Sequence, residues 1–207
     1  MMSWSNWSGL LLICLLGAMS PGPSLAMVTR HALAGGKRNG FAIAWAHAAG
    51  VGMYALLTMF GLAVLLHQSP RLFMVLTLLG AAYLTYLGLR ALMSQGGIAQ
   101  TLEAGNPESA AQAARDGLMI SLLNPKLALF FIALFSQFVQ PGSDTLAHFT
   151  LVATPFVIDG LWYTLVTLLL VHPAVLEKLR ARSRLIDRLS GVVLILLAVR
   201  VFVTALA

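Results

Sequence analysis

The chain has 207 residues, of which 59% are apolar and only 10% charged, and its formal net charge is +6. Soluble domains carry about a quarter charged residues, so this composition excludes a water-exposed globule and a disordered chain. Cys14 is the single cysteine, which excludes a secreted disulfide scaffold. We therefore expect an all-α polytopic membrane protein that is a single transmembrane domain over residues 1–207.

Apolar segments occupy most of the chain between its charged residues. A spanning helix needs about 20 apolar residues to cross roughly 30 Å of hydrocarbon. The continuous runs favour helices over the alternating pattern of a membrane barrel. The first segment has no Lys or Arg before it, so we interpret it as a retained helix with Trp4 and Trp7 as interfacial anchors. The expected spans cover residues 4–28, 41–66, 72–89, 117–139, 146–171 and 189–207.

The basic residues gather in every second connection between these spans. Ten positive charges lie in or beside the first, third and fifth connections, and the opposite side has only Arg71. The positive-inside rule puts those connections in the cytoplasm and both termini outside the inner membrane. Because the charges are spread over three short loops, we expect contact with lipid headgroups and no nucleic-acid partner. The ten are Arg30, Lys37, Arg38, Arg90, Arg115, Lys178, Arg180, Arg182, Arg184 and Arg188.

The second half of the sequence weakly repeats the first. Repeat A covers about 4–93, a cytoplasmic linker covers 94–116, and repeat B covers about 117–207. Three spans per repeat is an odd number, so the second copy enters the membrane from the opposite face, as in inverted-repeat transporters. Chance similarity between apolar segments is the alternative.

The first span contains Ser20, Pro21, Gly22 and Pro23 in succession. Each proline removes a backbone donor and clashes with the preceding turn, so two of them around a glycine predict a broken helix. Freed backbone groups are tolerated at membrane depth only where they face protein or a water-filled cavity. A simple kink is the alternative.

The fourth span contains a second break, at Asn124, Pro125 and Lys126. Helix ends at such breaks offer amides to a carboxylate and carbonyls to an ammonium group. We therefore expect both breaks to take part in substrate binding and translocation. Lys126 either holds a substrate carboxylate or extends toward the cytoplasmic headgroups.

Together these motifs carry a family resemblance over nearly the whole chain. The chain resembles the LysE/RhtB family of amino-acid exporters in the two breaks and in the segments between them. The resemblance implies a six-span inner-membrane exporter of an amino acid or a close derivative, driven by the proton gradient. Substrates within that family range from lysine and arginine to threonine, homoserine and leucine. The motifs are Ser20-Pro21-Gly22-Pro23, Gly35 and Gly40 in a basic loop, residues 79–84 with Leu87-Gly88, and Asn124-Pro125-Lys126 before a Phe-rich helix.

Two ionisable residues lie inside expected spans and are candidates for proton coupling. Asp159 is close to the midplane of the fifth span, where a carboxylate is costly and is therefore expected to be functional. It carries a proton, neutralises a substrate ammonium, or forms a structural pair with Arg200 or Lys126. His47, near the start of the second span, either relays protons or packs as a hydrogen-bonded core residue.

The remaining histidines fall at span ends and suggest no metal-ligand cluster. We expect no metal site, no cofactor and no enzyme activity, because no nucleophile–base spacing is apparent. The histidines in question are His31, His67, His148 and His172.

The function that the sequence favours is secondary active export of an amino acid by alternating access around the two breaks. Export of a metal ion or another small solute by a related architecture is one alternative, and a membrane scaffold that transports nothing is another. The expected partners are the small-molecule substrate and membrane lipid, and a homodimer is a further candidate.

Overall fold

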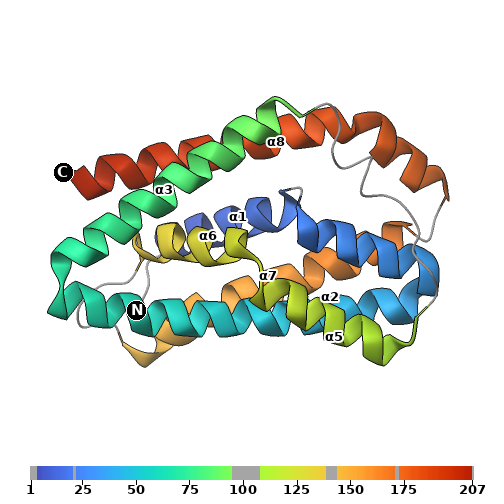
Figure 1. Cartoon of the computed structure of the whole chain (residues 1–207), viewed down its shortest axis with the longest axis horizontal. Coiled ribbons are helices and arrows are strands. Elements are labelled where there is room, and N and C mark those ends of the chain that lie inside the picture. Colours follow the sequence, from blue (N-terminus) through green and yellow to red (C-terminus); the bar gives the residue numbers. More distant parts are fainter. Residues whose placement is uncertain (1–3, 21, 95–107, 139–143, 171–172, 207) are drawn as a thin grey trace.

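The computed structural model describes residues 4–20, 22–94, 108–138, 144–170 and 173–206. These residues form seven α-helices and no strand, which confirms the all-α prediction (Figure 1). The helices are α1 (Trp4–Met19), α2 (Pro23–Gln68), α3 (Pro70–Leu92), α5 (Ala110–Leu122), α6 (Pro125–Phe135), α7 (Thr145–Leu170) and α8 (Pro173–Leu206).

Several of these helices have the length and composition of membrane spans. Four are long and apolar enough, and the bent pair α5 and α6 makes a fifth if it counts as one span. α1 is apolar but shorter than a full span. The helices therefore support a polytopic membrane protein, whereas six spans in two inverted repeats remain a prediction.

The first predicted break is present. α1 ends at Met19 and α2 begins at Pro23, with extended backbone at Gly22 (φ 174°). Pro23 occupies the first helical turn of α2, where a missing N–H breaks no helical hydrogen bond. Pro21 lies outside the described residues.

The second predicted break separates α5 from α6, which are bent by 54°. Asn124 caps α6, because its side-chain oxygen accepts a hydrogen bond from the Lys126 backbone N–H at 3.0 Å. Pro125 is in the first turn of α6. The hydroxyl of Tyr54 donates to the Leu122 carbonyl at 2.7 Å. A carbonyl at the end of α5 thus has a protein partner, as a break at membrane depth requires.

Three predicted boundaries differ from the structure. The expected loop after the first span is helical, and the chain reverses at Gly36, whose φ of 67° favours glycine (Figure 1). α5 begins at Ala110 and not at residue 117, because the Ser109 side chain caps it by accepting from the Gln112 N–H. α8 begins at Pro173 and not at residue 189, since its Arg- and Leu-rich start consists of good helix formers.

The helices pack in two groups around a shared interior. α2 packs along α5 and α7, while α3 and α8 pair with each other and contact the rest mainly through α6 (Figure 1). One apolar cluster joins residues of α1, α2, α3, α6, α7 and α8, and a smaller one joins α2, α5 and α7. The two breaks lie between these clusters, so polar groups there are enclosed by apolar packing on both sides.

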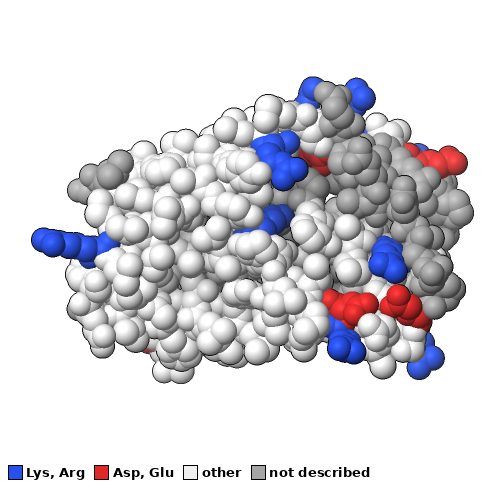
Figure 2. Space-filling view, in the orientation of Figure 1, with Lys and Arg blue, Asp and Glu red and all other residues white. Residues whose placement is uncertain are grey.

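Charge is distributed unevenly along the molecule. α1 begins and α8 ends at the left of Figure 1, and the turn at Gly36 and the start of α5 lie at the right. Figure 2 shows acidic and basic side chains gathered toward the right, with an almost uncharged surface at the left. This polarity agrees with basic connections on one side of a membrane.

A glycine in α5 allows that helix to lie close to α2. A Cβ added at Gly117 would stand 2.5 Å from the Ile43 carbonyl oxygen and 3.1 Å from its Cα, and these backbone atoms cannot move aside cheaply. We expect Gly117→Ala to destabilise the protein by about 1–3 kcal/mol, the usual cost of overpacking. A lower thermal unfolding midpoint in detergent would show this.

The matched control is Gly61→Ala, because nothing lies within 4 Å of a Cβ added at Gly61. Alanine is the better helix former, so this variant should keep or slightly raise the midpoint. Equal midpoints for the two variants would contradict the packing argument.

Candidate functional site

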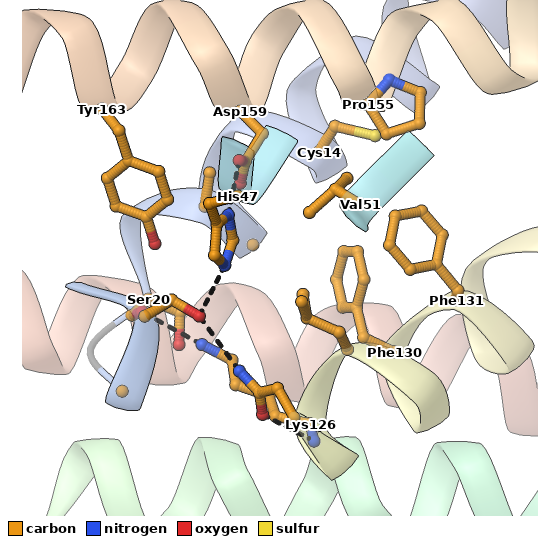
Figure 3. Close-up of a pocket in the computed structure, with 16 residues that line it drawn as sticks. Cys14, Ser20, His47, Val51, Lys126, Phe130, Phe131, Pro155, Asp159 and Tyr163 are labelled. Carbon is orange, nitrogen blue, oxygen red and sulfur yellow. Dashed lines mark hydrogen bonds and ion pairs between the residues drawn. The ribbon is translucent and has the colours of Figure 1, made fainter. Parts of the chain in front are cut away.

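A small cavity lies where the two helix breaks meet (Figure 3). Its volume is about 30 Å³, room for one or two water molecules. The site is therefore closed to any solute of amino-acid size in this arrangement. It is lined by Cys14, Gly17, Ala18, Ser20, Gly22, Ser24, His47, Val51, Asn124, Lys126, Leu127, Phe130, Phe131, Pro155, Asp159 and Tyr163.

A continuous hydrogen-bonded chain crosses the cavity from α7 to the start of α2. Asp159 Oδ2 lies 2.7 Å from His47 Nδ1, and His47 Nε2 lies 2.8 Å from Ser24 Oγ. All three residues are buried. When the carboxylate is ionised, the imidazole donates from Nδ1 and accepts the Ser24 hydroxyl proton at Nε2. His47 is thus the partner of Asp159, in place of the Arg200 or Lys126 considered from the sequence.

Serine, histidine and aspartate in this order also form the triad of hydrolytic enzymes. No spacing in the sequence indicates this arrangement, because His47 and Asp159 are 112 residues apart. The Ser24 oxygen, however, also accepts a hydrogen bond from Asn124 Nδ2 at 3.0 Å. The Ser24 hydroxyl thus donates to His47 and accepts from Asn124, so it joins the Asp159–His47 pair to the second break.

Lys126 links the two breaks directly. Its side chain is buried, and Nζ donates to the Ser20 carbonyl at 3.0 Å. A Cβ added at Gly22 would lie 3.5 Å from the same nitrogen. The ammonium therefore points into the junction of the breaks and not toward a membrane interface. A carbonyl is a weak partner for a buried ammonium, and a carboxylate in the same place would be a stronger one.

The structure brings most of the sequence-predicted site residues together. Around the cavity it places Ser20, Gly22, His47, Asn124, Lys126 and Asp159. Pro23 and Pro125 do not line the cavity; they are exposed and shape the site by starting α2 and α6. Pro21 lies outside the described residues. The roles of these residues in binding and proton transfer remain predictions.

Other residues of the site were not selected from the sequence. Tyr163 lies four residues after Asp159, on the same helix face, and its ring packs edge-on against His47 with centroids 5.2 Å apart. Ser24 lies four residues after Ser20, but the break between them obscures that spacing. Phe130 and Phe131 gave no signal that distinguishes them from core residues.

A second polar cluster lies where the N-terminal part of α2 meets α5, toward the charged end of the molecule. His31 Nε2 lies 3.2 Å from Asp116 Oδ2 and 3.9 Å from Glu108 Oε2. The sequence does not indicate this cluster at His31, since the residues that complete it are far apart in the chain.

The ligand atoms of this cluster lie within 4.8 Å of one another and are types that bind Zn²⁺. A guanidinium opposes a divalent cation, however, and Arg30 Nη2 lies 3.6 Å from Glu108 Oε1. We interpret the cluster as ion pairs that hold α2 against α5.

Comparison with known proteins decides the family. The sequence profile of the LysE type translocator matches residues 15–205. This chain belongs to that family. The match confirms the resemblance and makes the protein a member of a translocator family. No solved structure matches the chain.

Curated relatives agree with this assignment. An uncharacterized membrane protein of Pseudomonas aeruginosa is 38% identical over 67% of this chain and 64% of its own length, so the match spans less than two thirds of that relative. The leucine efflux protein of an Enterobacter species is 30% identical over 69% of this chain and 68% of its own. The homoserine/homoserine lactone efflux protein of Salmonella typhimurium is 30% identical over 76% and 77%.

Proposed function

We propose that the protein is a secondary active exporter of an amino acid, coupled to protons and working by alternating access around the cavity. The observation that carries this proposal is the meeting of one buried carboxylate, Asp159, and one buried ammonium, Lys126, at the junction of two broken helices. A zwitterion needs one partner of each sign, and broken helices supply further polar backbone groups. Two relatives whose names state amino-acid efflux support the same class.

The Asp159–His47 pair suits proton coupling. It joins α7 to α2 through a 2.7 Å contact that depends on how many protons the two groups share. Starting from the carboxylate and the neutral imidazole, one added proton makes an imidazolium–carboxylate ion pair, and a further one leaves a neutral carboxyl beside the imidazolium and weakens the attraction between the helices. Protonation of the Asp159 carboxylate would then loosen the site, and its release of that proton would close it.

We further propose six crossings of the bacterial inner membrane as two inverted three-helix repeats. α1 with the first part of α2, and α5 with α6, would each form one broken span. The basic connections would face the cytoplasm and both termini the outside. The start of α1 and the end of α8 lie at the same side of the molecule, which supports an even number of crossings (Figure 1).

Export of a metal ion is less well supported. Within the described residues, a group of three close metal-ligand side chains is found at His31, Glu108 and Asp116 and not at the cavity. A scaffold role would leave the buried ionic groups at the breaks without a purpose.

Counterflow in proteoliposomes tests the proposal. Vesicles preloaded with one amino acid should take up the same labelled compound, and an imposed pH gradient should drive net flux. A panel of neutral, cationic and acidic amino acids should contain at least one substrate. If no member shows either activity, amino-acid export is wrong.

Cys14 provides a second readout without any engineered label. It is the single cysteine of the chain, is 5% exposed and lines the cavity. Alternating access predicts that a membrane-permeant maleimide modifies it faster during turnover than at rest. A scaffold predicts one unchanged slow rate.

A further inference from the structure

The cavity has two chemically different sides. Figure 3 shows Tyr163, His47 and Ser20 at the left, whereas Cys14, Val51, Phe130, Phe131 and Pro155 lie at the right. The apolar side is formed by α1, α2, α6 and α7, so it is built from four separate helices and is not one exposed stripe. An amino acid is divided in the same way, into an ionic head and a side chain.

The ionic side chains of the cavity can pair with the ammonium and the carboxylate of an amino acid, but they leave no partner for a charge on its side chain. Among the described residues that line the cavity, Asp159 provides the carboxylate and Lys126 the ammonium, and His47 is already bonded to Asp159. A cationic or acidic side chain would need a further partner of opposite charge, because an unpaired buried charge is costly. The apolar side offers none.

We infer that the substrate is a neutral α-amino acid with an apolar side chain, which packs on the Phe130 side of the cavity opposite Gly17. This inference rests on the proposed function and adds the substrate class to it. The head would lie between Asp159 and Lys126, and the side chain would point toward α1 and α6.

Phe130 and Gly17 control the space on the apolar side. A Cβ added at Gly17 would lie 2.6 Å from the tip of the Phe130 ring. Phe131 is held between two other rings, with centroids 5.6 Å from Phe130 and 5.3 Å from Phe135. The Phe130 tip is therefore the group that swings away to admit a side chain, and Gly17 leaves it room to lie across α1 when the site is closed.

The first test is the substrate profile of the unchanged protein in counterflow. We expect leucine, isoleucine, valine or methionine to be taken up faster than lysine, arginine, aspartate or serine. Faster uptake of a charged or hydroxylated amino acid overturns the substrate class but leaves amino-acid export standing. Absence of uptake for every amino acid overturns both.

The second test changes the space opposite Phe130. In Gly17→Ala the added methyl group pushes the ring into the cavity, and we expect the ratio of leucine to alanine flux to fall about tenfold, the size of effect that one methyl group has in an apolar pocket. Gly9→Ala is the matched control on the same helix, because nothing lies within 4 Å of its added Cβ. It should leave the ratio unchanged.

A third variant changes the space in the opposite direction. Phe130→Leu shortens the group that limits the side chain, so the ratio of phenylalanine to leucine flux should rise. Thermal midpoints in detergent identify a variant that fails to fold, and the other variant then decides. Unchanged ratios in a folded Gly17→Ala or Phe130→Leu protein overturn the placement of the side chain.

Discussion

Asp159→Asn is expected to abolish export driven by a pH gradient while the protein still folds. Asparagine has the size of aspartate, and its oxygen can accept the Nδ1 proton of His47 as the carboxylate does. It cannot take up a proton or attract an ammonium group by charge. Loss of a charge-assisted hydrogen bond is worth about 1.5–3 kcal/mol, which predicts a decrease in gradient-driven flux of at least tenfold.

Comparing two assays on this variant separates the roles of Asp159. If the carboxylate only carries the proton, counterflow without a gradient persists; if it also holds the substrate ammonium, counterflow is lost as well. Asp144→Asn is the matched control, because Asp144 is exposed, caps α7 through the Ala147 N–H, and can be replaced there by asparagine. Full gradient-driven export by Asp159→Asn would remove Asp159 from the coupling mechanism.

Hydrogen bonds connect the two breaks with the buried Asp159–His47 pair. Ser24 belongs to the first break and hydrogen-bonds His47, while Asn124 of the second break donates to the same Ser24 oxygen. A change in the protonation of the Asp159–His47 pair therefore acts on both breaks through the single Ser24 hydroxyl. The amide of Asn124 also caps α6, so a shift of Ser24 acts on the start of that helix. This connection gives a physical route from a proton to a movement of α6 and its phenylalanines.

The sequence predicted the features that depend on local chemistry. Charge positions separated the apolar segments, and prolines located both helix breaks because their effect on a helix is short-ranged. Asp159 was selected because a carboxylate inside an apolar segment has few structural reasons to be there. None of these three predictions depends on which helices are neighbours in the fold.

Features that depend on packing between distant segments were missed. His31 and Asp116 are 85 residues apart, and His47 and Asp159 are 112 apart, so no spacing in the sequence indicates either contact. A loop is predicted around Gly36, but the residues on both sides of it are helical. A single glycine with positive φ reverses the chain there, and such a turn needs no other change in composition that the sequence could reveal.

Lys126→Met should weaken binding of the substrate carboxylate. Methionine has a similar length but no charge, and it leaves the Ser20 carbonyl without its 3.0 Å donor. In the proposed cycle the substrate carboxylate replaces that carbonyl as the partner of Nζ, which converts a weak charge–dipole contact into an ion pair. We expect the half-saturating substrate concentration in counterflow to rise at least tenfold, the same free-energy scale as a charged hydrogen bond.

An amide analogue of the substrate gives the more selective readout, because it keeps the ammonium and the side chain but lacks the carboxylate. The unchanged protein should prefer the acid strongly over the amide, and Lys126→Met should lose most of that preference. Lys178→Met, at an exposed position of α8, is the matched control and should keep it. If Lys126→Met retains the preference of the unchanged protein, the ammonium only ties the two breaks together through Ser20 and does not touch the substrate. The carboxylate must then be bound by other donors at the breaks, such as the backbone amides at the helix ends or the Asn124 side chain.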